Sequence, residues 1–367
     1  MFDPSLVPNV DPNPLPAPFW LFKVLLVVTF FLHIVAMNFM VGGAGLALFA
    51  RWREKKNAYG QRIFLDVSKK VPTFLAATIS LGIAPLLFVQ VIYGQYFYTS
   101  SIVMAWPWFL VIVFLIFAYY GFYFVAYKGE KRPVAAGRVM LFSTTLVLVI
   151  GFIYTNNITL SQVPSRWVQK YFASVAGWNL NLTEPTLIPR YLHFMTSAVA
   201  VGGLLLVFIA WANWKRDEGY ARAIFTLGGK AYLYATMAQF VVGSWFFMSL
   251  PRELRMMFMG DNLLETGLFG FGVAAALVTI LLMSRALRTG NIRLAAMGVS
   301  ALTAVIILTM VVMRDMLRDA YLAPYFHPQE FAVQTQWSPL VGFLVLFVAG
   351  IGLWLLMLKR YGLFRRA

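Results

Sequence analysis

Long apolar runs, separated by short polar segments, fill most of the chain. About 20 apolar residues in a helix cross the hydrocarbon core of a membrane, and runs of this length can be placed nine times. The predicted spans are residues 19–50, 71–97, 103–127, 139–160, 187–214, 231–250, 263–287, 294–313 and 340–358. The pattern predicts an all-α fold, a polytopic membrane helix bundle of about nine transmembrane helices that forms a single transmembrane domain over residues 1–367.

Basic residues are concentrated in alternate connections between the spans. Of the 30 Lys and Arg residues, 22 lie in the segments 51–70, 128–138, 215–230, 285–293 and 359–367. The positive-inside rule therefore predicts that the N-terminus lies outside and the C-terminus is cytoplasmic, in a multi-pass protein of the cell inner (cytoplasmic) membrane. The net charge of +16 follows this topology, so no nucleic-acid partner is expected.

Three segments are predicted on the outer face. They are the N-terminal segment 1–18, an interfacial segment 161–185 and an outer loop 314–339. Trp167, Val168, Tyr171, Phe172 and Val175 form an apolar stripe at helical spacing, which is typical of a helix that lies in the membrane interface.

The chain has no cysteine, which excludes disulfides, thiolate-held iron–sulfur clusters and covalent attachment of c-type haem. Two of the three histidines, His33 and His193, lie inside predicted spans, both in the outer half of the membrane. A polar imidazole is costly in hydrocarbon, and neutral imidazole is a common axial ligand of haem iron. We therefore take both as candidate metal ligands; the alternative is a hydrogen bond to a neighbouring helix. His327 is predicted to be exposed.

Four charged residues near the outer ends of spans are further candidates. Arg190 lies three residues before His193 and shares its helical face, where a cation suits a cofactor that carries carboxylates. Arg252 and Arg255 follow the sixth span and would hold haem propionates or a quinone headgroup. Glu253, between them, is the candidate catalytic residue that would accept a proton from a quinol.

Three sequence patches resemble one known family. They are residues 31–34 (FLHI), residues 83–94, which end in FVQVIYG, and residues 155–157 (TNN) followed by His193 with Gly202 nine residues later. These patches are similar to those of subunit I of the cytochrome bd quinol oxidases over residues 19–215. The resemblance implies one or two haems b, with His193 at a low-spin haem and His33 at a second site. It also implies cofactor contacts by Gln90 and Gly202, quinone as substrate and a second membrane subunit.

Several features of that family have no match. The chain lacks the methionine expected early in the seventh span, the glutamate of the eighth and the acidic pair of the third, and the connection 251–262 is short. These absences weaken the argument for oxygen reduction more than the argument for electron transfer.

The sequence therefore favours a membrane cytochrome b-like subunit of a quinol-dependent oxidoreductase complex. It would pass electrons between the quinone pool and a partner on the outer face, such as a c-type cytochrome. The alternatives are an oxygen-reducing terminal quinol oxidase subunit and a haem-free membrane anchor. A solute transporter is disfavoured, because span interiors away from their ends carry no charged residue.

Overall fold

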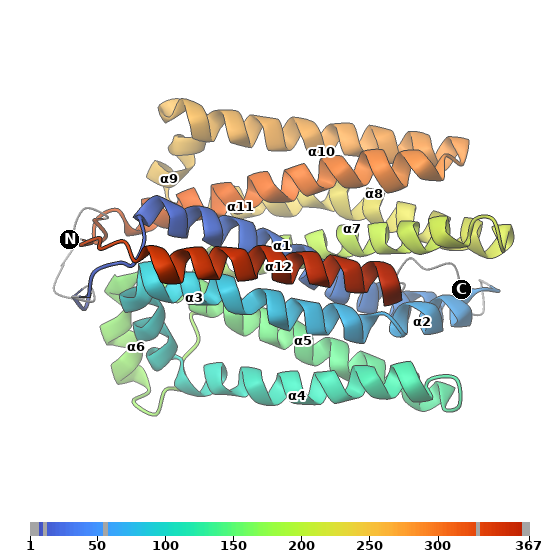
Figure 1. The fold of residues 1–367 in the computed structure, drawn as a ribbon, viewed down its shortest axis with the longest axis horizontal. Coiled ribbons are helices and arrows are strands. Elements are labelled where there is room, and N and C mark those ends of the chain that lie inside the picture. Colours follow the sequence, from blue (N-terminus) through green and yellow to red (C-terminus); the bar gives the residue numbers. More distant parts are fainter. Residues whose placement is uncertain (1–6, 10–12, 54–57, 328–330, 362–367) are drawn as a thin grey trace.

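The computed structural model describes residues 7–9, 13–53, 58–327 and 331–361, which are almost entirely helical. The helices are α1 (Phe19–Trp52), α2 (Gly60–Ser68), α3 (Val71–Val103), α4 (Ala105–Lys128), α5 (Pro133–Ser161), η3 (Pro164–Arg166), α6 (Trp167–Ala173), α7 (Leu187–Asn213), α8 (Glu218–Ser249), α9 (Arg252–Met256), η4 (Met257–Asp261), α10 (Leu263–Thr289), η5 (Leu294–Val299), α11 (Ser300–Leu322) and α12 (Trp337–Tyr361). The predicted all-α helix bundle is confirmed. The long helices run along one common axis (Figure 1).

Within the described residues, eight helical stretches are long and apolar enough to cross a membrane. The sequence predicted nine spans, and α8 accounts for the difference. This helix has 32 residues and runs beside α7 (Figure 1), but polar residues such as Gln239 and Ser244 dilute its apolar stretch. The Gln239 side chain has a structural reason, since its Nε2 donates to the backbone oxygen of His193 at 2.9 Å.

Glycines let the central helices approach closely. On α7, Gly202 faces Gly42 of α1, and a Cβ atom added to Gly202 would lie 2.6 Å from the Gly42 Cα. One residue later, Gly203 packs against α8, where an added Cβ would lie 2.9 Å from the Tyr232 nitrogen. Such small-residue contacts let helix backbones touch within a membrane. They hold α1, α7 and α8 together as the centre of the bundle.

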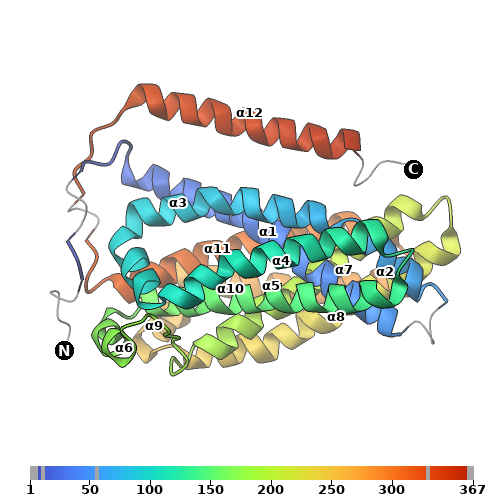
Figure 2. The ribbon, with the colours of Figure 1, turned by 90° about the horizontal axis from the view of Figure 1, so that it is seen from below.

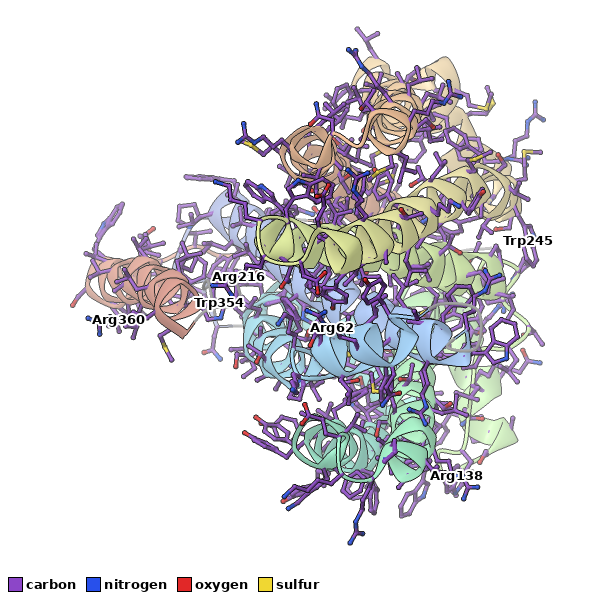
Figure 3. The ribbon with its side chains drawn as sticks, turned by 90° about the vertical axis from the view of Figure 1, so that its right-hand side faces the viewer. Arg62, Arg138, Arg216, Trp245, Trp354 and Arg360 are labelled. Carbon is purple, nitrogen blue, oxygen red and sulfur yellow. The ribbon has the colours of Figure 1, made fainter. Side chains whose placement is uncertain are left out.

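The connections after α1, α4, α7 and α10 lie at one end of the bundle, here called the basic end; α6 and α9 lie at the other, the α6 end (Figure 1). Figure 3 looks onto the basic end, with Arg62, Arg138, Arg216 and Arg360 labelled. At this end Asp217 caps α8 by accepting from the Tyr220 nitrogen. This hydrogen bond and the ion pair with Arg62 hold the pKa of Asp217 below its usual range.

The end of α11 differs from the sequence prediction. Residues 314–322 were assigned to an outer loop, but the helix continues to Leu322. Its last turns are polar yet stable because Asp315 forms ion pairs with both Lys23 of α1 and Arg318. The connection that follows pairs with the N-terminal segment, where the Leu15 nitrogen donates to the Ala332 oxygen at 2.7 Å.

Helix α12 stands apart from the rest of the bundle (Figure 2). Its most apolar stretch has no buried residue. Contact with the bundle is made near its start, where the ring of Phe343 lies 6.1 Å from that of Phe88 on α3.

Candidate functional site

His33 is held in a defined orientation by α3. Its Nδ1 lies 2.9 Å from the backbone oxygen of Thr78, and Gly82 leaves room for the ring, since a Cβ there would lie 2.9 Å from Nδ1. A carbonyl oxygen only accepts hydrogen bonds, so Nδ1 carries the proton and donates. In the neutral imidazole the lone pair of Nε2 is then available to a ligand. A hydrogen bond from the other ring nitrogen is the usual support of a metal-ligating histidine.

The imidazole lines a cavity of about 390 Å³ between α1, α3, α4, α5, α7 and α11. Its walls are mostly aliphatic and aromatic. Polar groups enter at a few places, among them His33, Tyr93, Gln162, Arg314 and Arg318. Sites for organic cofactors have this character, with an apolar lining, a few placed polar groups and a volume of roughly 300–1,000 Å³.

A network of ionic and polar side chains adjoins this cavity through Tyr93 and Arg318, where the start of α1 meets the end of α11. Lys23 binds Asp319 at 2.6 Å and also pairs with Asp315, and Asp315 pairs in turn with Arg318. Tyr93 of α3 donates to Asp319. These charges lie near the ends of α1 and α11, where the charged turn of α11 is packed against α1 and α3.

His193 occupies a different environment. Its ring faces α8, where a Cβ on Gly243 would lie 3.3 Å from the Nδ1 atom, and it lies 6.0 Å from the ring of Phe246. The Nδ1 atom is buried and has no hydrogen-bond partner in the described residues. An unpaired buried nitrogen is costly, and ligation or a bound polar group would satisfy it.

Arg190 lies one turn before His193 and is 3% exposed. Its guanidinium lies 5.1 Å from the Phe246 ring centroid and donates from Nη1 to Gln162 at 2.9 Å. Nε and Nη2 are buried without a partner among the described residues. Arg190 and His193 thus both lie near the Phe246 ring, and the two free donors of Arg190 suit an anionic group.

Gln162 also lines a second cavity, of about 450 Å³, at the α6 end. This cavity lies between the α5–α6 connection, the segment before α7 and the ends of α8 and α11. Its polar lining includes Arg166, Glu184 and Tyr321, and the Tyr321 hydroxyl has no hydrogen-bond partner in the described structure. Through Gln162, the polar second cavity and the apolar His33 cavity share part of one wall.

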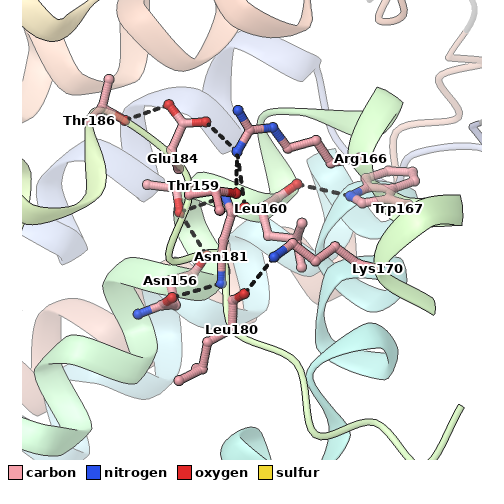
Figure 4. Close-up of polar contacts among 11 residues, drawn as sticks. Asn156, Thr159, Leu160, Arg166, Trp167, Lys170, Leu180, Asn181, Glu184 and Thr186 are labelled. Carbon is pink, nitrogen blue, oxygen red and sulfur yellow. Dashed lines mark hydrogen bonds and ion pairs between the residues drawn. The ribbon is translucent and has the colours of Figure 1, made fainter. Parts of the chain in front are cut away.

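Asn156, near the end of α5, holds the connection to α7 (Figure 4). Asn156 Oδ1 accepts from the Asn181 nitrogen at 2.9 Å, and the Asn181 side chain donates to Thr159. Arg166 pairs with Glu184 at 3.3 Å. The predicted interfacial segment is helical at η3 and α6, and these polar contacts position both the wall of the second cavity and the start of α7.

Several predicted residues lie away from both cavities. Arg252 and Glu253 are exposed on α9, and Arg255 donates to the Met248 backbone oxygen at 3.0 Å. Gln90 accepts from Tyr98 on an outer face of α3.

Two further predictions concern Gly202 and His327. Gly202 packs closely against the backbone of Gly42, and its predicted contact with a cofactor stays a prediction. His327 is exposed, as predicted.

The residues around His33 fit a haem group, whereas His193 lines neither of the two cavities. At His33 the chain offers an oriented imidazole, an apolar cavity and two arginines in its wall. At His193 it offers an unpaired ring nitrogen beside the free donors of Arg190. Sequence reasoning missed the supporting residues Thr78, Gly82 and Gly243. Gly82 and Gly243 lie on other helices than the histidines they face, and a backbone carbonyl leaves no trace in the sequence, so no local signal marks these residues.

Comparison with known proteins shows which solved structure has a similar fold. No protein-family model matches the sequence, and no curated protein matches it. Among solved structures, the fold is similar to "The structure of bd oxidase from Geobacillus thermodenitrificans", with a TM-score of 0.68 at 14% sequence identity. The match covers 95% of this chain and 100% of that chain. The chain therefore has the fold of a bd oxidase chain, in agreement with the resemblance of its sequence.

Proposed function

We propose that this protein is a membrane haem b-type subunit that passes electrons between quinol and a redox partner on the outer face. The observation that carries this proposal is the orientation of His33. Its Nδ1 donates a hydrogen bond to the backbone oxygen of Thr78. The ring lines an apolar cavity large enough for an organic cofactor. The shared fold with a bd oxidase supports the choice of haem as that cofactor.

Two groups of residues would hold haem. His33 would bind the iron of one haem, with Arg314 and Arg318 in the same cavity wall. His193 would supply the ligand of a second haem, with the free donors of Arg190 available to its carboxylates. When bound, haem supplies one-electron transfer. The chain contributes the orientation of each imidazole and the exclusion of water by apolar walls.

Quinol is the proposed electron donor, and the second cavity is the best-formed place for its headgroup. Glu184, Arg166 and Tyr321 line that cavity and offer both hydrogen-bond donors and acceptors. The exposed Glu253 on neighbouring α9 remains the proposed acceptor of the quinol proton. The outer partner would be a c-type cytochrome or a second membrane subunit, and the exposed His327 would lie on the docking face.

A reduced-minus-oxidised visible spectrum with a haem assay tests the proposal. The proteins to compare are the wild type and the variants His33→Ala and His193→Ala, with the exposed His327→Ala as matched control. We expect haem b in the wild type and in the control. Each of the other two variants should lose or convert one spectral component.

The same proteins distinguish two other functions, one by the haem assay and the other by an added measurement of oxygen consumption. Wild-type protein without haem would contradict the proposal and favour a haem-free membrane anchor. Oxygen consumption that depends on His33 would instead indicate a terminal oxidase subunit.

A further inference from the structure

The charges at the end of the His33 cavity do not balance. The cluster consists of Lys23, Arg314, Asp315, Arg318 and Asp319, which are three cations and two anions. The two oxygens of Asp315 are bound to Lys23 and Arg318. The two oxygens of Asp319 are bound to Lys23 and the Tyr93 hydroxyl. All four carboxylate oxygens are therefore engaged, and none of them is engaged by Arg314.

Arg314 faces the same cavity as His33. Its guanidinium lies 4.2 Å from the centroid of the Phe30 ring, and no hydrogen bond or ion pair joins it to the part of the chain that the structure describes. A cation without a counter-ion in an apolar wall is costly, because charged groups away from water need a partner. The cluster is thus complementary to an anion that enters the cavity.

We propose that Arg314 binds a carboxylate carried by a largely apolar molecule that lies in the His33 cavity. The apolar lining selects the body of this ligand, and the guanidinium selects its acid group, since arginine pairs with carboxylates through two parallel hydrogen bonds. Arg318 adds one buried free donor, its Nε. This inference rests on the proposed function in one respect: haem is the first source of such a carboxylate, and a fatty acid from the membrane is the second.

For the His33 cavity, we thus propose Arg314 in place of the arginines that the sequence suggested for haem propionates. Arg252 is exposed and Arg255 is bound to the Met248 backbone. Arg190 serves the surroundings of His193. In the wall of the His33 cavity, Arg314 in the last turns of α11 has all its guanidinium donors available for a carboxylate.

The test compares two haems that differ only at their acid groups. Full-length protein expressed under haem limitation is titrated with protohaem and with protohaem dimethyl ester, and binding is followed by the Soret band. We expect the His33 site of the wild type to prefer the free acid at least about tenfold. Arg314→Gln should abolish this preference, and Arg314→Lys should restore part of it. Arg222→Gln is the control, because Arg222 is exposed and pairs with Glu218 on α8.

Each outcome decides a separate question. Equal binding of acid and ester by the wild type, or an unchanged preference in Arg314→Gln, would overturn this inference and leave the proposed haem function standing. If Arg314→Gln does not fold, the comparison within the wild type decides alone. If the wild type takes up neither haem, the proposed function fails, and binding of labelled oleate becomes the test. Oleate binding that is lost in Arg314→Gln supports the carboxylate site with a lipid source, whereas equal oleate binding by both proteins overturns it.

Discussion

Gly82 determines whether His33 can keep its orientation. A Cβ atom at this position would lie 2.9 Å from both Nδ1 and Cε1 of the imidazole, which is closer than real contacts allow. We predict that Gly82→Ala displaces the ring from the Thr78 carbonyl and so weakens the His33 site. The measurement is haem content per protein together with the reduced-minus-oxidised spectrum, and the component that depends on His33 should fall severalfold.

Gly94 provides the control in the same helix. A Cβ there would lie 3.6 Å from the nearest atom, on the Tyr98 ring, an ordinary contact. Gly94→Ala should therefore keep the wild-type spectrum. A Gly82→Ala protein with wild-type haem content and spectrum would show that His33 does not depend on this packing, and would argue against its role as an oriented ligand.

At the scale of the helices, the contact between α1 and α7 decides the stability of the bundle. A Cβ on Gly42 would overlap the backbone oxygen of Ala198, and backbone atoms cannot move aside as a flexible side chain can. We predict that Gly42→Ala separates the two helices and lowers the free energy of unfolding by about 1–3 kcal/mol. Thermal unfolding in detergent, followed by tryptophan fluorescence, measures the change.

Gly45, almost one turn further along α1, tests whether the effect is steric. No atom lies within 4 Å of a Cβ at Gly45, and alanine favours the helix over glycine. Gly45→Ala should therefore be neutral or slightly stabilising. Equal destabilisation by both substitutions would mean that loss of glycine flexibility, and not close packing, is responsible.

The sequence predicted elements better than contacts. Apolar runs located all the long helices, because hydrocarbon imposes the same length and composition on each span. The same reasoning stopped α11 at residue 313, since a turn with Arg314 and Asp315 looks like a membrane boundary. Burial of this turn depends on Lys23, which is 296 residues away from its partner Asp319. No local pattern reveals such a partner.

The candidate site shows the same difference between what local sequence predicts and what depends on contacts in space. Polar residues inside apolar runs identified His33 and His193, because their cost in hydrocarbon demands a reason. Which arginine lies near each histidine in space depends on how the helices are rotated. The sequence analysis could use only proximity along the chain. That reasoning selected Arg190, which shares the helix of His193 and stays a prediction. It did not select Arg314, which lines the His33 cavity from α11.

On the scale of the whole molecule, the two ends of the bundle predict how it sits in the membrane. The basic connections share one end and α6 lies at the other (Figure 1), so α6 should face outward if the positive-inside rule holds. Because the chain has no cysteine, single cysteines can be introduced without background. We predict that Ala176→Cys, just after α6, reacts with a membrane-impermeant maleimide in intact spheroplasts. Thr289→Cys, at the end of α10, should react only after the membrane is opened.

Both positions are exposed in the structure, so access to the reagent is limited by the membrane and not by packing. The reverse labelling pattern would place the basic end outside. The ionic cluster of Lys23, Asp315 and Arg318 near the α6 end would then face the cytoplasm, and the electron partner would have to be sought there. With the predicted pattern, the second cavity and the start of α7 lie near the outer face, so a haem held by His193 would lie closer to a partner on that side.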